Sequence, residues 1–125
     1  LPENLPRIDV DRIMIEQVLL NLVKNGIEAM YDTPFANRRL EISAHQIDGR
    51  WLQVEIADHG HGLPEEDIER IFAPFYTTKQ EGMGIGLAIC RSIIEFHQGR
   101  LWVEPRRDGG TIFRFTVPIE ENDDE

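Results

Sequence analysis

Two pairs of short segments, in which apolar and polar residues alternate, constrain the fold of this 125-residue chain more than any other feature. The first pair is residues 40–47 and 52–58, and the second is residues 100–104 and 111–117. Each pair is joined by a turn that contains Asp and Gly, a composition typical of β-hairpins. Alternation with a period of two indicates strands with one buried face, so the sequence predicts two hairpins.

Segments with the helical period lie before and between the hairpins. Residues 11–30 carry apolar side chains at spacings of three and four, and Asp11 is a suitable N-cap. The apolar set is Ile15, Val18, Leu19, Leu22, Val23, Ile27 and Met30. Residues 84–97 predict a mostly buried helix that Gly99 stops, and residues 64–72 predict a short helix opened by a proline. The expected fold is α+β: a two-layer sandwich with a mixed, mostly antiparallel sheet packed on three helices.

Composition limits the domain organisation and the partners. With 41% hydrophobic and 29% charged residues, we expect one globular domain over residues 1–119. Residues 120–125 lack apolar side chains and predict an acidic, disordered tail. The formal net charge of −10 argues against nucleic acid as a partner, because phosphate backbones are bound by clustered Lys and Arg.

No apolar run approaches the roughly 20 residues of a membrane span. We therefore expect no targeting signal and no membrane contact in this chain, whereas a longer parent protein is free to carry an anchor. The single cysteine, Cys90, lies in an apolar-rich run and predicts a reduced, buried thiol. A cytoplasmic setting fits these features.

A glycine-rich segment precedes the second long helix. Gly82, Gly84 and Gly86 leave backbone N–H groups unhindered at a helix start, where phosphate oxygens bind readily. Lys79 is placed to approach a terminal phosphate, although an exposed lysine needs no function. The spacing matches neither a Walker loop nor a dinucleotide-binding loop. Residues 77–86 offer little to bury and predict either a short lid ordered by ligand or an ordinary flexible loop.

Asp58 ends a predicted strand and is followed by Gly60 and Gly62. Its carboxylate can accept a hydrogen bond from an exocyclic amine such as adenine N6, and the glycines let a flat ligand approach. An ordinary aspartate at a strand-to-turn junction explains the same pattern equally well. His59 and His61 imitate a metal pair, but without a third ligand they are more typical of a loop.

Asn21 and Asn25 lie four residues apart on the first predicted helix, so both side chains point the same way. An amide oxygen at the border of the apolar stripe can coordinate a hard cation such as Mg²⁺. Taken alone, the pair is more often a set of surface or capping asparagines. The asparagine pair therefore indicates a Mg²⁺ site only in combination with the other motifs of the chain.

These motifs together resemble a known family. The sequence QVLLNLVKN (residues 17–25), Asp58-x-Gly60-x-Gly62, Phe72-x-x-Phe75, Gly82-x-Gly84-x-Gly86-Leu87 and Gly109-Gly110-Thr111 resemble, in order and spacing, the N, G1, F, G2 and terminal glycine boxes of the sensor histidine kinase catalytic domain. The resemblance covers nearly the whole chain. FAPFYTTK followed by a very short lid is similar to kinases that sense oxygen, nitrogen status or dicarboxylates in bacterial two-component systems.

The resemblance implies the Bergerat, or GHKL, sandwich with ATP held between the long helix and the lid. It implies that Asn25 ligates Mg²⁺ with Asn21 beside the phosphates, that Asp58 binds the adenine amine, and that Lys79 neutralises phosphate charge. Asn21, Asn25 and Lys79 are thus the catalytic candidates. The implied nucleotide-binding residues are Asn21, Asn25, Asp58, Gly60, Gly62, Phe72, Phe75, Thr78, Lys79, Gly82, Gly84, Ile85, Gly86, Leu87 and Thr111. Phe72 and Phe75 would anchor the lid.

None of the four histidines is followed by the acid and later proline that mark the phosphoacceptor helix of this family. The resemblance therefore implies that the acceptor histidine lies on a separate helical domain, and that a response regulator receives the phosphoryl group. Asn21 stands where ATP-hydrolysing relatives carry a water-orienting glutamate, which favours transfer over hydrolysis, although Glu16 and Glu28 lie nearby. Two alternatives remain open: a degenerate nucleotide-binding regulatory module, and a serine kinase or ATPase of the same fold.

Overall fold

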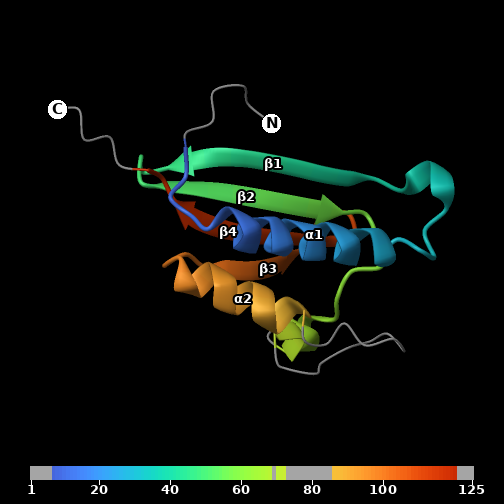
Figure 1. Cartoon of the computed structure of the whole chain (residues 1–125). Coiled ribbons are helices and arrows are strands. Elements are labelled where there is room, and N and C mark those ends of the chain that lie inside the picture. The colour runs from blue at the N-terminus through green and yellow to red at the C-terminus, as the bar shows by residue number, and fades with distance from the viewer. Residues whose placement is uncertain (1–6, 69, 73–85, 121–125) are drawn as a thin grey trace.

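The computed structural model describes residues 7–68, 70–72 and 86–120, which form a two-layer α+β sandwich (Figure 1). The elements are α1 (Arg12–Glu28), β1 (Leu40–Ile47), β2 (Trp51–Asp58), α2 (Gly86–Phe96), β3 (Leu101–Pro105) and β4 (Thr111–Pro118), with the 3₁₀ turns η1 (Phe35–Asn37), η2 (Glu65–Asp67) and η3 (Arg70–Phe72). The predicted fold class is confirmed. Where a short helix was expected at residues 64–72, the described residues form two 3₁₀ turns. No helix within the described ranges is long and apolar enough to cross a membrane.

The sheet has the strand order β1-β2-β4-β3, and every neighbouring pair is antiparallel. Both predicted hairpins are present, as the β1–β2 and β3–β4 pairs. They are joined edge to edge by β2 and β4, which pair over their whole length from Trp51↔Pro118 to Asp58↔Thr111. This pairing brings the end of β2 and the start of β4 to the same end of the sheet.

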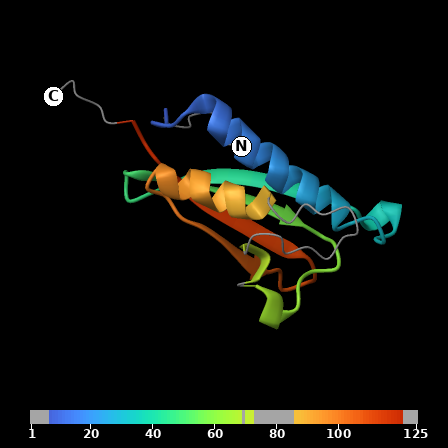
Figure 2. The same cartoon turned by 60° about the horizontal axis from the view of Figure 1, so that its bottom comes forward.

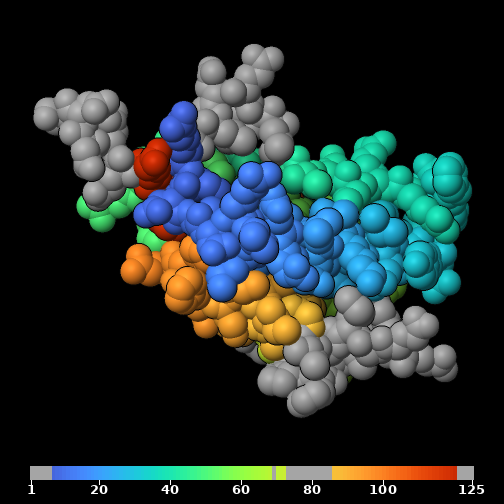
Figure 3. Space-filling view, viewed as in Figure 1, coloured from blue at the N-terminus to red at the C-terminus, as the bar shows by residue number. Residues whose placement is uncertain are grey.

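Both α-helices cover one face of the sheet (Figures 1 and 2), and their side chains form one continuous layer in the space-filling view (Figure 3). The core lies between this layer and the sheet. Its members are Ile15, Val18, Leu22, Ala44, Leu52, Val54, Ile56, Ile71, Phe72, Cys90, Ile94, Leu101, Val103, Phe113, Phe115 and Val117. The edge strand β1 contributes one of these residues, whereas β2 and β4 bury every second side chain.

Helix α1 begins as the sequence predicts. Asp11 is the N-cap, and its Oδ1 accepts a hydrogen bond of 3.0 Å from the N–H of Met14. One member of the apolar set, Ile27, does not face the core, since this side chain is 49% exposed. At this end of the helix Gly26 faces the sheet, and the next residue is turned about 100° away from it.

Helix α2 ends in a Schellman arrangement. Gln98 N–H donates to the carbonyl of Glu95 and Gly99 N–H to that of Ile94, both at 2.9 Å. The residue with positive φ is Gln98 (φ 68°), and Gly99, which the sequence predicts as the residue that stops the helix, follows it directly. Glycine is required at position 99 for a different reason, because a Cβ there would overlap the carbonyl oxygen of Thr116 in β4.

A buried histidine links the end of α2 to the start of α1. His97 Nε2 accepts a hydrogen bond of 2.9 Å from the N–H of Asp11, and Nδ1 lies 2.8 Å from the carbonyl oxygen of Ile93. These partners assign a neutral imidazole with its proton on Nδ1. The location agrees with the sequence interpretation of His97 as a structural residue at a helix end.

The close approach of Gly99 to β4 predicts a large effect of a single methyl group. We expect Gly99→Ala to lower the free energy of unfolding by about 3 kcal/mol, because backbone atoms must move to accept the Cβ. Gly49→Ala is the matched control, since Gly49 has φ 69° but no atom within 4 Å of the added Cβ; its cost should be about 1 kcal/mol. Urea denaturation measures both values, and equal losses would contradict the close approach.

Candidate functional site

Most of the described candidate residues gather at one end of the sandwich, where the end of β2, the start of β4, the second half of α1 and the start of α2 meet (Figures 1 and 2). The candidates that the structure describes are Asn21, Asn25, Asp58, Gly60, Gly62, Phe72, Gly86, Leu87 and Thr111. The candidates Phe75, Thr78, Lys79, Gly82, Gly84 and Ile85 lie outside the described residues. The nucleotide-binding roles of both sets therefore stay predictions.

Asp58 is the buried acid of this end, with 3% of its surface exposed. Its Oδ1 accepts a hydrogen bond of 2.9 Å from Gly60 N–H, and the backbone N–H of Thr111 also donates to the carboxyl group. Burial raises the pKa of Asp58 above its ordinary value, and the two backbone donors offset this in part. A carboxylate offers about four acceptor positions, so this group has capacity for a further donor from a ligand.

The helix approaches Asp58 through residues that the sequence interpretation missed. A Cβ on Gly26 would lie 2.7 Å from Leu40 Cδ1, the end of a flexible side chain, and 3.5 Å from Asp58 Cβ, an ordinary contact distance, so α1 lies close to the end of β2 here. The carbonyl of Ala29 accepts a hydrogen bond from His61 N–H at 3.3 Å. A glycine inside a helix lowers the stability of the helix by about 1 kcal/mol relative to alanine. The presence of Gly26 in the helical pattern could therefore have indicated a packing role.

Asn21 connects α1 to the first turns of α2. Its Nδ2 donates to the carbonyl of Gln17 at 3.1 Å, and its Oδ1 lies 3.5 Å from the position that a Cβ on Gly86 would take. The Asn21 side chain also forms a hydrogen bond with the thiol of Cys90. Burial raises the pKa of this thiol to about 11. Asn25 follows one turn later and is half-buried, in agreement with its predicted place at the border of the apolar stripe.

Phe72 and Leu87 flank the part of the chain that the structure leaves undescribed. The Phe72 ring is buried edge-to-face against Phe113, with 6.5 Å between ring centroids, and the Arg91 guanidinium lies 4.7 Å from the Phe72 centroid. Leu87 is half-buried and packs on the same core. The described residues Phe72 and Leu87 are thus both packed on the core.

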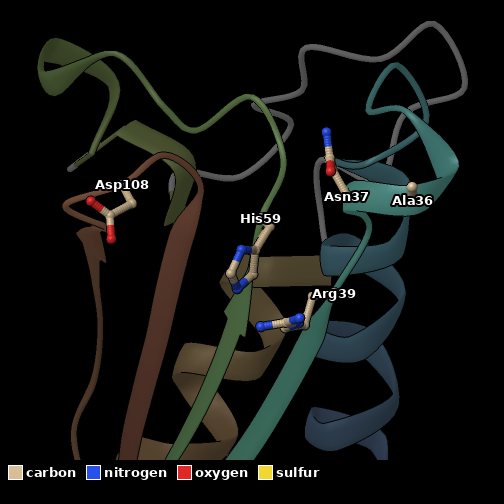
Figure 4. Close-up of a pocket in the computed structure, with 5 residues that line it drawn as sticks. All are labelled: Ala36, Asn37, Arg39, His59 and Asp108. Atoms are coloured by element: carbon tan, nitrogen blue, oxygen red, sulfur yellow. The ribbon is translucent and has the colours of Figure 1, made fainter.

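The two histidines after β2 bond to protein groups. His59 Nε2 lies 3.1 Å from Glu41 Oε1, and His61 Nδ1 lies 2.7 Å from the carbonyl oxygen of Gly62. Within the described ranges, no three His, Cys, Asp or Glu side chains are grouped to hold a metal ion. A cavity of about 390 Å³ opens beside His59 and is lined by Ala36, Asn37, Arg39, His59 and Asp108 (Figure 4).

The chemistry of the described site suits a nucleotide. Asp58 supplies an acceptor for an amine, and the half-buried amides of Asn21 and Asn25 supply hard oxygen donors of the kind that Mg²⁺ accepts. The start of α2 lies beside Asn21 and offers the positive end of a helix dipole to an anion. An amine, a metal and a phosphate group can therefore be bound at one end of the fold.

Residues 10–121 match the family of histidine kinase-, DNA gyrase B- and HSP90-like ATPases. The chain is 44% identical over 117 residues to the C4-dicarboxylate transport sensor protein DctS of Rhodobacter capsulatus, covering 94% of this chain and 18% of that protein. It is 43% identical over 111 residues to the sensor protein FixL of Bradyrhizobium diazoefficiens, covering 89% of this chain and 22% of that protein. The chain thus spans about a fifth of the length of these curated relatives.

Solved structures show the same relationship. The nucleotide-free catalytic domain of the histidine kinase ThkA matches with a TM-score of 0.78 and 42% identity, over 90% of this chain and 70% of that domain. The ThkA kinase in complex with the response regulator protein TrrA matches with a TM-score of 0.77 and 39% identity, over 95% of this chain and 32% of that one. With its fold, its buried acid and these matches, the chain belongs to the family of histidine kinase-, DNA gyrase B- and HSP90-like ATPases, as a catalytic domain of the sensor histidine kinase type.

Proposed function

We propose that this chain binds Mg²⁺-ATP and transfers the γ-phosphoryl group to a histidine on a separate helical domain of a longer sensor kinase, for relay to a response regulator. The observation that carries the proposal is the buried carboxyl group of Asp58, tied to Thr111 and placed at the same end as Asn21, Asn25 and the start of α2. We also propose a cytoplasmic location, because the substrate is a cytoplasmic nucleotide.

The adenine end is the better described half of the proposed site. Asp58 would accept a hydrogen bond from the N6 amine of adenine, while Gly60 and Gly62 leave room for the ring. Gly62 has φ 77° and lies against Gly110. Thr111 is buried opposite Asp58, where its side chain would support the base.

The phosphate end combines α1, α2 and the segment between η3 and α2. Asn25 would hold Mg²⁺, with Asn21 beside the phosphates, and a bound Mg²⁺ neutralises phosphate charge. Gly86 and Leu87 would present backbone amides to the phosphates, and Phe72 would anchor the lid through its contact with Phe113. We propose that Phe75, Thr78, Lys79, Gly82, Gly84 and Ile85 complete this part.

The described positions of the histidines favour an acceptor in another domain. His45 is exposed on β1, away from Asp58, whereas His59 and His61 are bonded beside the site and His97 is buried between the helices. Phosphoryl transfer needs mainly positioning and charge neutralisation, so an imidazole from a separate domain can serve as the nucleophile. The ThkA complex with a response regulator supports the proposed onward relay.

Transfer is a better proposal than hydrolysis. Hydrolysing relatives are expected to carry a glutamate where Asn21 stands. Glu16, one turn earlier, does not replace it, because this exposed side chain bonds to Arg12 at 3.1 Å. A regulatory module without transfer remains the alternative that the first experiment below distinguishes.

The first prediction concerns Asn25. With MgATP and the helical acceptor domain of the parent kinase, Asn25→Ala should label the acceptor histidine at least about 100-fold more slowly, because the metal loses a ligand. Asn37→Ala on η1 is a matched control with an exposed asparagine and should label normally.

Without the acceptor domain, the wild-type chain should bind ATP and label none of its own histidines. Wild-type chain that binds MgATP but never labels the acceptor would favour the regulatory module.

The second prediction concerns Asp58 and pH. Because its pKa is raised in the folded chain, Asp58 adds stability when protonated, and that contribution is lost as the pH rises through the raised value. The free energy of unfolding of the wild type should therefore fall, relative to Asp58→Asn, as the pH rises from about 4. Urea denaturation at several pH values measures this difference.

The same substitution should weaken ATP binding at pH 7.5 by about tenfold or more, because an amide has one acceptor oxygen where the carboxylate has two. Isothermal titration calorimetry measures this affinity. Asp48→Asn, in the exposed turn of the first hairpin, is the control and should change neither quantity. Unchanged ATP affinity in Asp58→Asn would show that Asp58 does not read the base.

A further inference from the structure

Three side chains from three separate segments form a hydrogen-bonded chain next to Asp58. Arg106 Nη1, in the turn between β3 and β4, lies 3.1 Å from His59 Nδ1, and His59 Nε2 lies 3.1 Å from Glu41 Oε1 on β1. The same Arg106 nitrogen donates to the carbonyl oxygen of Gly109 at 2.7 Å. We call Glu41, His59 and Arg106 the histidine relay.

The partners assign the protonation state of the imidazole. A guanidinium is always charged and only donates, so His59 Nδ1 must be the acceptor from Arg106. The proton of a neutral imidazole then lies on Nε2, which donates to Glu41. The hydrogen bond from His59 is the first cause of the lowered pKa of Glu41, and the charges of Arg39 and Arg106 act in the same direction.

The relay lies on the opposite face of the sheet from the Asp58 side chain. Asp58 points to the helix layer, whereas Glu41 is paired with Ala57, whose side chain lies on the other face. His59 directly follows Asp58. The relay therefore contacts the end of β2 on the face of the sheet away from the helices, and it does not contact the proposed nucleotide.

The turn held by Arg106 is the one that packs against Asp58. Gly110 lies so close to the end of β2 that a Cβ there would be 2.9 Å from the Asp58 carbonyl carbon and 3.0 Å from His59 Cα. The next residue, Thr111, donates its N–H to the Asp58 carboxyl group. Arg106 also closes the turn, because its N–H donates to the Gly110 carbonyl at 3.0 Å.

We propose that His59 is a positioning residue for adenine recognition: through Arg106 it fixes the 106–110 turn, and with it Thr111, against Asp58. The inference rests on the proposed function, since it concerns the base that Asp58 would read. Of the two contacts of His59, the one to Arg106 fixes the 106–110 turn, because Arg106 belongs to that turn. The contact to Glu41 orients the imidazole so that Nδ1 faces Arg106.

The relay should respond to acid. The cavity in Figure 4 is lined by His59 and Arg39, whose side chains extend toward each other, so water reaches the imidazole. With a proton on Nδ1, His59 could no longer accept the hydrogen bond from Arg106, and two positive charges would face each other. The hydrogen bond from Nε2 to Glu41 would become stronger. The ionisable groups around His59 are Arg39 just before β1, Glu41 on β1, Asp58 at the end of β2, His61 in the following loop, and Arg106 and Asp108 in the β3–β4 turn.

Two substitutions separate the two contacts. The amide oxygen of His59→Asn falls near the position of Nδ1 and can accept from Arg106, whereas the amide nitrogen of His59→Gln falls near Nε2 and can donate to Glu41. At pH 8 we expect His59→Gln to weaken ATP binding about tenfold and His59→Asn less than about threefold. His45→Gln, the same change at an exposed position of β1, is the control and should bind like the wild type.

The pH profile provides a readout that a purely structural role would not produce. Between pH 8 and 5, wild-type ATP affinity should fall more steeply than that of His59→Asn, because only the wild-type side chain can take up a proton at this position. All other ionisable groups are common to both chains, so the difference isolates His59. Calorimetric titration with ATP, and thermal unfolding of the nucleotide-free chains as a check of folding, supply the data.

The outcomes separate the two proposals. If the wild type binds no ATP, the proposed function fails and the positioning role fails with it. If the wild type binds ATP but the two His59 variants bind equally well, or their pH profiles coincide with that of the wild type, only the positioning role is overturned. Weak binding by His59→Gln, with an unfolding temperature within about 3 °C of that of His59→Asn, supports it.

Discussion

The pairing of β2 with β4 is the interaction on which the rest of the structure depends. Each hairpin is local in sequence, and an isolated hairpin is only marginally stable in water. Joined through these two strands, the hairpins form a sheet wide enough to bury a face against α1 and α2. The same register sets Asp58 opposite Thr111, so the pairing that builds the core also brings together the two residues of the proposed adenine end.

The proposed site contains features that are unfavourable for stability. A buried carboxyl group such as Asp58 is costly to ionise, as its raised pKa records, and backbone donors from Gly60 and Thr111 compensate only in part. Gly26, a poor helix former, stands where α1 lies closest to Asp58. Such local conflicts are expected where a surface is shaped for a ligand and not for packing alone.

Local patterns were predicted most reliably. The period of two located both hairpins, and the period of three to four located α1 with its cap at Asp11. The errors arose where tertiary contacts override local preference. Gln98 takes the left-handed conformation at the end of α2, and Gly99, which the sequence predicts as the residue that stops the helix, is required one residue later by its contact with β4. Ile27 is exposed because Gly26 takes the position against the sheet.

The sequence by itself determined the two long helices, the four strands and the family, because these depend on local periodicity and on motifs in fixed order. Only the tertiary structure decided the strand order β1-β2-β4-β3 and the approach of Gly26 to Asp58. It alone also joined Glu41, His59 and Arg106, three residues from separate segments. The physical reason is that alternation specifies which residues share a face, whereas the neighbour of each strand is chosen by long-range packing that no local pattern encodes.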